Sequence, residues 1–266
     1  MEIIGYISFI IMGIVLGLIG GGGSILTVPI LVYILGSDPV LATSYSLFIV
    51  GVSAAIGSIQ FFRNKLVDIK AAIVFSIPSL IAVFLTRAYL MPSIPDSLIN
   101  TSGFVLDKPL AILLLFAILM LAASFSMIKS GKSNIEADII APKFNYPMIF
   151  IEGFVVGVLT GLVGAGGGFL IIPALVILAK IPMKMAVGTS LVIIAVKSII
   201  GFSGDMMAEI DINWMSLIIF TGISIIGMLI GTILSKKIPG SSLKKGFGYF
   251  VLIMGIFIII KELFLN

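Results

Sequence analysis

The 266-residue sequence is 60% hydrophobic and only 11% charged, and its mean hydropathy is +1.30. Soluble domains carry about 25% charged residues, so this composition excludes a soluble globular protein. Cysteine and histidine are absent, which excludes disulfides and thiolate or imidazole metal sites, and we expect neither a metal nor a cofactor. The net charge of +4 comes from lysines and arginines beside hydrophobic segments, a placement typical of topology signals rather than nucleic-acid binding.

Apolar runs long enough to cross a membrane recur along the chain. In the first part we expect two legs around a glycine cluster and then three longer helices, near residues 3–19, 24–35, 41–62, 69–91 and 108–129. The polar segment 131–146 predicts a solvated linker. After it the pattern restarts, with helices expected near residues 147–164, 168–181, 184–207, 213–236 and 245–264. The chain therefore divides into residues 1–130, the linker, and residues 147–266.

The restart repeats the sequence itself as well as its hydropathy. An offset of 144 positions brings Gly20 onto Gly164 and Pro29 onto Pro173. Two Leu/Ile-rich strings share aliphatic residues by chance, but they do not readily share glycines and a proline in register. We therefore infer that the chain contains a duplication.

Charge bias predicts that the two halves have opposite orientations. The linker and residues 63–70 and 236–245 are basic, whereas the expected loop 205–211 is acidic and includes Asp205. Basic loops stay in the cytoplasm, so the corresponding loops 63–70 and 205–211 face opposite sides and both termini lie outside. Arg87 fits this pattern poorly, and we expect it to snorkel to the interface. The expected fold is an all-α, multi-pass protein of the cytoplasmic (inner) membrane with two inverted-topology repeats.

The second leg of each half is too short to cross the membrane alone. Residues 24–35 span about 18 Å as a helix, against a hydrocarbon core of about 30 Å. We therefore expect each repeat to contain a broken or re-entrant, glycine-tipped hairpin followed by three transmembrane helices. Non-helical backbone at mid-membrane is tolerated only where it is buried in protein or lines an aqueous cavity.

The duplicated glycine tracts at the hairpin tips are candidate binding elements. They leave backbone N–H groups unpaired at the start of a helix, where the positive end of the helix dipole favours an anion. The alternative is close helix packing, which we expect of single glycines such as Gly13, Gly51, Gly153 and Gly227. The candidate tract residues are Gly20, Gly21, Gly22, Gly23, Ser24, Gly164, Gly166, Gly167 and Gly168.

Hydroxyl groups and one lysine complete the candidate site. The hydroxyl candidates, at the start of the next helix in each half, are Thr43, Ser46, Thr189 and Ser190. Such hydroxyls donate to oxyanions, although they also bond back to their own helix. Lys197 lies halfway along its helix, where a charge costs about 2.5–3.5 kcal/mol, so we expect it to face the interior and neutralise an anion. The alternative is a lysine that snorkels or pairs with Glu152; its counterpart in the first half is Ser53. Glu152 and Gln60 are the candidate residues for coupling.

Enzyme activity is not expected. Residues 201–204 match the G-x-S-G pattern of an intramembrane serine protease, but the chain has no histidine to act as general base. Neither glycine tract continues into the Lys-Ser/Thr of a nucleotide-binding P-loop.

The chain resembles the TauE/SafE family of sulfite and organosulfur exporters. The resemblance rests on residues 17–24 with Pro29, on their copy 161–168 with Pro173, and on residues 186–191. It covers nearly the whole chain. It implies a cytoplasmic-membrane permease for sulfite, sulfoacetate or related anions, driven by an ion gradient.

These features together give a functional hypothesis. We expect a secondary-active exporter of a small sulfur-containing anion, such as sulfite or an organosulfonate, that works by alternating access and holds the anion at midplane between the glycine tips. A passive anion channel and a non-transporting membrane assembly partner remain as alternatives. The expected partners are the anion and membrane lipid, without nucleic acid; a coupling proton or sodium ion and a homo-oligomer stay open.

Overall fold

The computed structural model describes residues 2–101, 104–129, 146–164, 167–178, 181–207 and 211–264. The first half contains α1 (Glu2–Ile19), α2 (Gly22–Pro29), the π-helix η1 (Ile30–Ile34), α3 (Pro39–Arg63), α4 (Ile69–Leu85), the π-helix η2 (Thr86–Leu90), α5 (Met91–Ser93), β1 (Ser97–Thr101), β2 (Phe104–Asp107) and α6 (Lys108–Lys129). The second half contains α7 (Tyr146–Val163), α8 (Gly168–Pro173), the π-helix η3 (Ala174–Leu178), α9 (Met183–Met207), α10 (Trp214–Ser235) and α11 (Gly240–Phe264). The predicted linker, apart from Tyr146, and Gly166 lie outside the described residues.

The predicted helices are found within a few residues of their expected bounds. In the described part of the chain, six helices are long and apolar enough to span a membrane, so the protein is an all-α, multi-pass membrane protein. The sequence does not predict the antiparallel β1–β2 pair between α5 and α6. Both second legs, α2 and α8, end at prolines that the 144-residue offset aligns, Pro29 and Pro173. Each leg then continues as a π-helix. The change of helix type directly follows a proline in both halves, and a proline removes one backbone hydrogen bond from the turn that precedes it.

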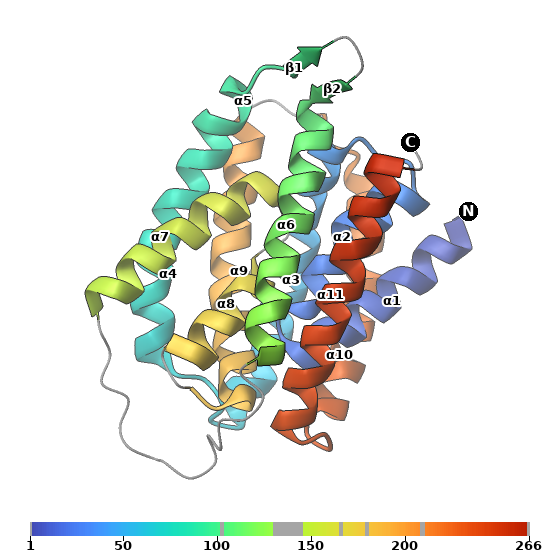
Figure 1. Ribbon diagram of the computed structural model, residues 1–266. Helices are drawn as coiled ribbons and strands as arrows, with labels where there is room; N and C mark the ends of the chain where they lie inside the picture. Colours follow the sequence, from blue (N-terminus) through green and yellow to red (C-terminus); the bar gives the residue numbers. More distant parts are fainter. Residues whose placement is uncertain are drawn as a thin grey trace.

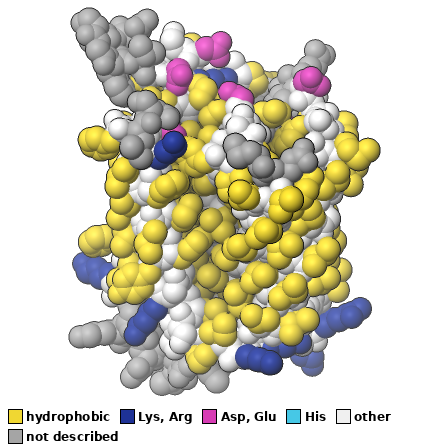
Figure 2. Space-filling model, turned by 90° about the vertical axis from the view of Figure 1, so that its right-hand side faces the viewer, with side chains coloured by type: hydrophobic (Ala, Val, Ile, Leu, Met, Phe, Trp, Pro, Cys, Tyr) yellow, Lys and Arg dark blue, Asp and Glu magenta, His cyan; other side chains and the backbone are white. Residues whose placement is uncertain are grey.

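The molecule has two chemically different ends separated by an apolar belt. The first residues of α1, the last residues of α11 and the β1–β2 pair lie at one end, which we call the terminal end (Figure 1). On the face drawn in Figure 2, most Lys and Arg side chains gather at the opposite end, which we call the basic end, and Asp and Glu gather at the terminal end. Between the ends, α4 exposes Ile73, Ile77 and Ile81 at four-residue spacing, as a lipid-facing helix does.

The long helices pack in pairs that join the two halves. Helices α3 and α9 pack against each other, as do α6 and α11. The first hairpin helix of each half packs on the opposite half, α1 on α10 and α7 on α4. The core therefore lies between the halves rather than within either one.

Small residues allow these helices to approach closely, as predicted for single glycines. A Cβ on Gly13 would lie 2.8 Å from the backbone nitrogen of Met228 in α10, and a Cβ on Gly153 would lie 2.7 Å from the Phe75 carbonyl oxygen in α4. Within the first hairpin, Gly23 packs α2 onto α1 in the same way, since its Cβ would lie 2.6 Å from the Leu16 nitrogen. Backbone contact of this kind is typical of transmembrane helix interfaces.

Candidate functional site

The two glycine-rich hairpin turns meet inside the protein. Gly20, Gly164 and Gly167 have φ angles of +79°, +72° and +70°, a left-handed conformation that side chains disfavour. A Cβ on Gly21 would overlap the backbone of Gly168, and a Cβ on Gly168 would overlap that of Gly21. The structure therefore brings the two predicted glycine tracts into direct backbone contact.

Each turn also rests on the long helix of the other half. A Cβ on Gly20 would lie 2.7 Å from Ser190 Oγ and 3.0 Å from the Val187 Cα in α9. A Cβ on Gly164 would overlap Thr43 in α3. Thr43 and Val187 are related by the 144-residue offset, so the two contacts are equivalent and cross between the halves.

The helices that leave the turns begin without side-chain caps. Helix α2 has Gly21 as its N-cap and α8 has Gly167, and neither N-cap makes a side-chain hydrogen bond. The Ser24 hydroxyl bonds back to the Gly21 carbonyl at 2.6 Å, and the Ser190 hydroxyl donates to the Val187 carbonyl at 2.8 Å. First-turn N–H groups that no side chain caps are suited to an acceptor such as an anion.

Lys197 places a buried amino group at this meeting point. Its side chain is fully buried, and its Nζ has no hydrogen-bond partner among the described residues. A Cβ on Gly167 would lie 2.6 Å from Nζ, so the ammonium group lies against the second glycine turn. It neither snorkels nor pairs with Glu152. An ammonium group in apolar surroundings is costly without a counter-charge, so this position favours an anionic ligand.

Other buried hydroxyls without partners lie on the same two helices. Gly51 of α3 packs against Ser198 of α9, and this antiparallel register places Ser53 near the level of Lys197. The hydroxyls of Ser46, Ser53 and Ser198 are buried and have no hydrogen-bond partner within the described residues. Helices α3 and α9 thus supply buried hydroxyl donors on the same packed pair that carries Lys197.

Thr189 has a different set of contacts from the other candidates. Its hydroxyl accepts a hydrogen bond from the Asp68 N–H at 2.9 Å, where Asp68 caps α4. Tyr45, the counterpart of Thr189 by the 144-residue offset, accepts from the N–H of Asn213, the cap of α10, at 2.6 Å. These two hydrogen bonds fasten the start of α4 and of α10 to the opposite half, and the first of them engages the Thr189 hydroxyl.

Two residues of the terminal end correct the sequence predictions. The predicted acidic loop 205–211 and the predicted helix 184–207 both include Asp205; the structure places it within α9, where it is 1% exposed. Arg87 was expected to snorkel, but it too is 1% exposed and forms an ion pair with Asp205, Nη1 to Oδ1 at 3.4 Å. Nη1 also donates to Thr43 Oγ1 at 2.9 Å, and the Ser44 hydroxyl donates to Asp205 Oδ2. Both corrections share one cause, because each buried charge has the other as its partner.

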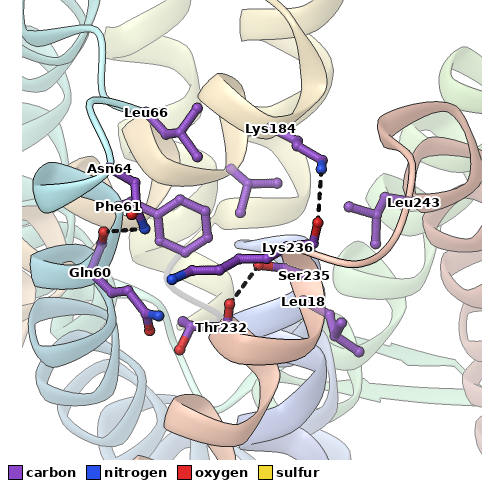
Figure 3. Close-up of a pocket in the computed structure, with 11 residues that line it drawn as sticks. Leu18, Gln60, Phe61, Asn64, Leu66, Lys184, Thr232, Ser235, Lys236 and Leu243 are labelled. Carbon is purple, nitrogen blue, oxygen red and sulfur yellow. Dashed lines mark hydrogen bonds between the residues drawn. The ribbon is translucent and has the colours of Figure 1, made fainter.

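A pocket of about 280 Å³ lies at the basic end. Figure 3 shows the side chains that line it. It reaches Val187, which contacts the first glycine turn, and it includes the predicted Gln60. Lys184 Nζ donates to the Lys236 carbonyl at 3.3 Å, and the side chain of Lys236 extends across the pocket (Figure 3). The lining residues are Leu18, Gln60, Phe61, Asn64, Leu66, Lys184, Val187, Thr232, Ser235, Lys236 and Leu243. Two lysines at its wall give this pocket a field that attracts anions.

Comparison with known proteins identifies the family. The model of the sulfite exporter TauE/SafE family matches residues 6–258. The chain belongs to this family. It is 28% identical to a "Probable membrane transporter protein" of Xylella fastidiosa over 94% of this chain and 91% of the relative. It is 26% identical to "Probable membrane transporter protein YunE" of Bacillus subtilis over 97% and 99%, and 32% identical to a relative of the same description from Methanocaldococcus jannaschii over 76% and 73%. No solved structure matches the chain.

Membership in the TauE/SafE family places the chain among membrane transporters.

One of the two candidate coupling residues, Glu152, lies apart from the glycine turns. Glu152 is on α7, roughly 17 Å along the helix from Val163. One of its carboxylate oxygens is buried without a partner in the described part of the structure. Among the described residues, no three Asp or Glu side chains are grouped closely enough to hold a metal ion.

Proposed function

We propose that this TauE/SafE family member is a secondary-active exporter of a small sulfur-containing anion, such as sulfite or an organosulfonate. The anion is held at midplane between the two glycine turns by backbone N–H groups and α3–α9 hydroxyls, and Lys197 balances its charge. The observation that carries this proposal is the buried, unpartnered Nζ of Lys197 beside the touching turns. An oxyanion satisfies the ammonium group and the uncapped helix starts together.

Crossed contacts between the halves support an alternating-access mechanism with inverted repeats. Gly20 rests on α9 and Gly164 on α3, while α1 packs on α10 and α7 on α4. An inverted duplication produces equivalent contacts of this kind, and its halves can rock against each other around a shared site. The pocket at the basic end and the closed Arg87–Asp205 cluster at the terminal end match a state open to one side only.

Charge bias supports the direction of export. The basic end faces the cytoplasm by the positive-inside rule, so the pocket is the cytoplasmic access and both termini face outside. A negative-inside potential favours anion exit by about 2.3 kcal/mol per charge per 100 mV. Membrane voltage can therefore drive export, and Glu152 and Gln60 stay the candidates if a proton or sodium ion is coupled.

The proposal is tested by uptake of radiolabelled sulfite into proteoliposomes containing the purified protein. Flux is measured with and without an imposed potential and pH gradient, for wild type, Lys197→Ala and the control Lys70→Ala. Lys70 is exposed at the start of α4, so its removal leaves flux unchanged. We expect saturable, potential-dependent flux that is lost in Lys197→Ala.

The same assay separates the alternatives. A passive channel gives flux that does not saturate and shows no counterflow. A non-transporting membrane partner gives no flux of sulfite, thiosulfate or small sulfonates under any gradient, and this result would overturn the proposed function.

A further inference from the structure

The guanidinium group of Arg87 is only partly used by its protein contacts. Nη1 makes the bonds to Thr43 and Asp205, whereas Nε and Nη2 are buried and have no partner among the described residues. Asp205, in contrast, has a partner on each carboxylate oxygen, Arg87 on Oδ1 and Ser44 on Oδ2. Both carboxylate oxygens of Asp205 therefore have hydrogen-bond partners, whereas the Arg87 guanidinium group keeps unpartnered N–H donors among the described residues.

The open Nε–Nη2 edge is the part of arginine that best matches an oxyanion. Its N–H groups point in parallel and bind two oxygens of a carboxylate, phosphate or sulfonate at once. Leaving buried N–H donors of a cation without acceptors is costly. A buried, unpartnered edge of this kind favours a ligand with two oxygen acceptors, which is the chemistry of sulfite and of sulfonates.

The absence of a side chain at Gly164 leaves space for the Arg87 guanidinium group. A Cβ on Gly164 would lie 2.5 Å from Nη2, so the second glycine turn brings its backbone directly against the open edge. Arg87 also lies on the π-helix η2, whereas α10, the corresponding helix of the second half, is α-helical over Trp214–Ser235. π-Helical turns are rare and frequently mark functional sites.

We propose that Arg87 is a second anion-binding residue, at the terminal end of the pathway, and that Asp205 is its resting counter-ion. Asp205 lies about 12 Å along α9 from Lys197, so an anion released by the lysine meets the arginine next. The anion takes the Nε–Nη2 edge, Arg87 leaves Asp205, and the carboxylate keeps Ser44. This inference rests on the proposed function for the path of the anion, but binding at Arg87 can be measured without transport.

Binding is measured by titrating purified protein with sulfite, using sulfate and chloride as comparison anions. The readout is the fluorescence of Trp214, the single tryptophan of the chain, which packs against Phe202 of α9 with ring centroids 6.1 Å apart. The variants are Arg87→Gln, Asp205→Asn and the double variant. Ser203→Ala is the control, because this exposed hydroxyl lies two residues before Asp205 and, among the described residues, bonds only to the Ile200 carbonyl.

We expect Asp205→Asn to bind sulfite more tightly than wild type, because the competing carboxylate charge is gone. Arg87→Gln and the double variant are expected to bind roughly tenfold or more weakly, because charge-assisted bonds are lost. Wild-type affinity in the double variant would show a purely structural pair and overturn the inference. Thermal unfolding of each variant identifies loss of fold, and the double variant keeps the test open if a single variant does not fold.

The two proposals fail in different ways. Sulfite flux with wild-type affinity and rate in the double variant removes the Arg87 site and leaves the transporter proposal in place. Arg87-dependent binding of an anion without sulfite flux supports the Arg87 site and removes the proposed substrate or activity.

Discussion

The two ends of the α3–α9 pair occupy equivalent positions in the two halves and differ in chemistry. The polar residues of the terminal end are Thr43, Ser44 and Asp205, and their counterparts at the basic end are Val187, Gly188 and Phe61. The Ser44–Asp205 hydrogen bond is replaced by apolar packing, in which a Cβ on Gly188 would lie 2.9 Å from Phe61 Cβ. Equivalent backbone contacts therefore carry a polar closure at one end and an open pocket at the other.

Arg87 follows the same asymmetry. Its neighbour Thr86 packs on Gly161, and at the other end Thr232 packs on Gly17, the counterpart of Gly161. The position equivalent to Arg87 therefore falls at or beside Thr232, which lines the pocket. Of the two corresponding positions, the one at the terminal end carries the Arg87–Asp205 ion pair.

The largest expected effect distinguishes the two glycine turns. Gly164→Ala is expected to lower the free energy of unfolding by about 2–4 kcal/mol, because its φ is positive and its Cβ would overlap Thr43. Gly20→Ala is expected to cost less, since its nearest contact is the movable Ser190 hydroxyl at 2.7 Å. Unfolding in an SDS titration measures both. Gly222→Ala is the control, because a Cβ at this position would have no atom within 4 Å. If Gly164→Ala and Gly20→Ala lowered the free energy of unfolding equally, the expected difference between the two turns would be wrong.

The next effect concerns the charge at the centre of the pair. Lys197→Ser is expected to reduce sulfite flux roughly 10- to 100-fold, because charge-assisted hydrogen bonds are lost. Adding Ser53→Lys moves the ammonium group to the equivalent position and is expected to restore part of the flux. Proteoliposome uptake measures both variants. If the double variant stays as inactive as Lys197→Ser, positions 53 and 197 do not share one site.

A smaller effect is expected in the pocket of the basic end. Lys236→Glu reverses a charge at the pocket wall and is expected to raise the KM for sulfite a few-fold at low salt, with a smaller change at high salt. Lys70→Glu makes the same charge change at an exposed site of α4 outside the pocket. Equal effects of the two variants would indicate a general surface field rather than a role of the pocket.

The last prediction assigns the ends to the two sides of the membrane without affecting transport. The chain has no cysteine, so single cysteines report position directly. Ser93→Cys, exposed at the terminal end, is expected to react with an impermeant maleimide added to intact cells, and Lys237→Cys, exposed at the basic end, only after lysis. The reverse pattern would invert the proposed direction.

Much of the fold follows from features that are local in the sequence. Long apolar runs and glycine clusters determine the helix bounds, and the aligned prolines Pro29 and Pro173 mark the change to π-helix in both halves. The sequence repeat predicts the approach of the glycine tracts, because inverted hairpins that enter from opposite sides would bring their tips to the same depth. Lys197 is recognisable because a charge in the middle of an apolar helix is rare.

The polar closure was missed because its members are far apart in the sequence. The acidic residues Glu209 and Asp211 that follow Asp205 favour a loop there, and no acidic residue is adjacent to Arg87 in the sequence to indicate its partner. Intramembrane charges usually have partners, so one unexplained arginine and one aspartate at similar depth were the available signal. The pocket could not be derived, because five separate segments of the chain form it.

The contact between Gly21 and Gly168 limits which substitutions the two turns can accept. Two backbones touch there with no side chain between them, so almost any substitution forces the turns apart before it alters the chemistry of the contact. Under the proposed function, a change of transported anion is therefore expected to come from neighbouring positions, above all 53 and 197. A redesign of selectivity would hold the glycines constant and diversify those two positions first.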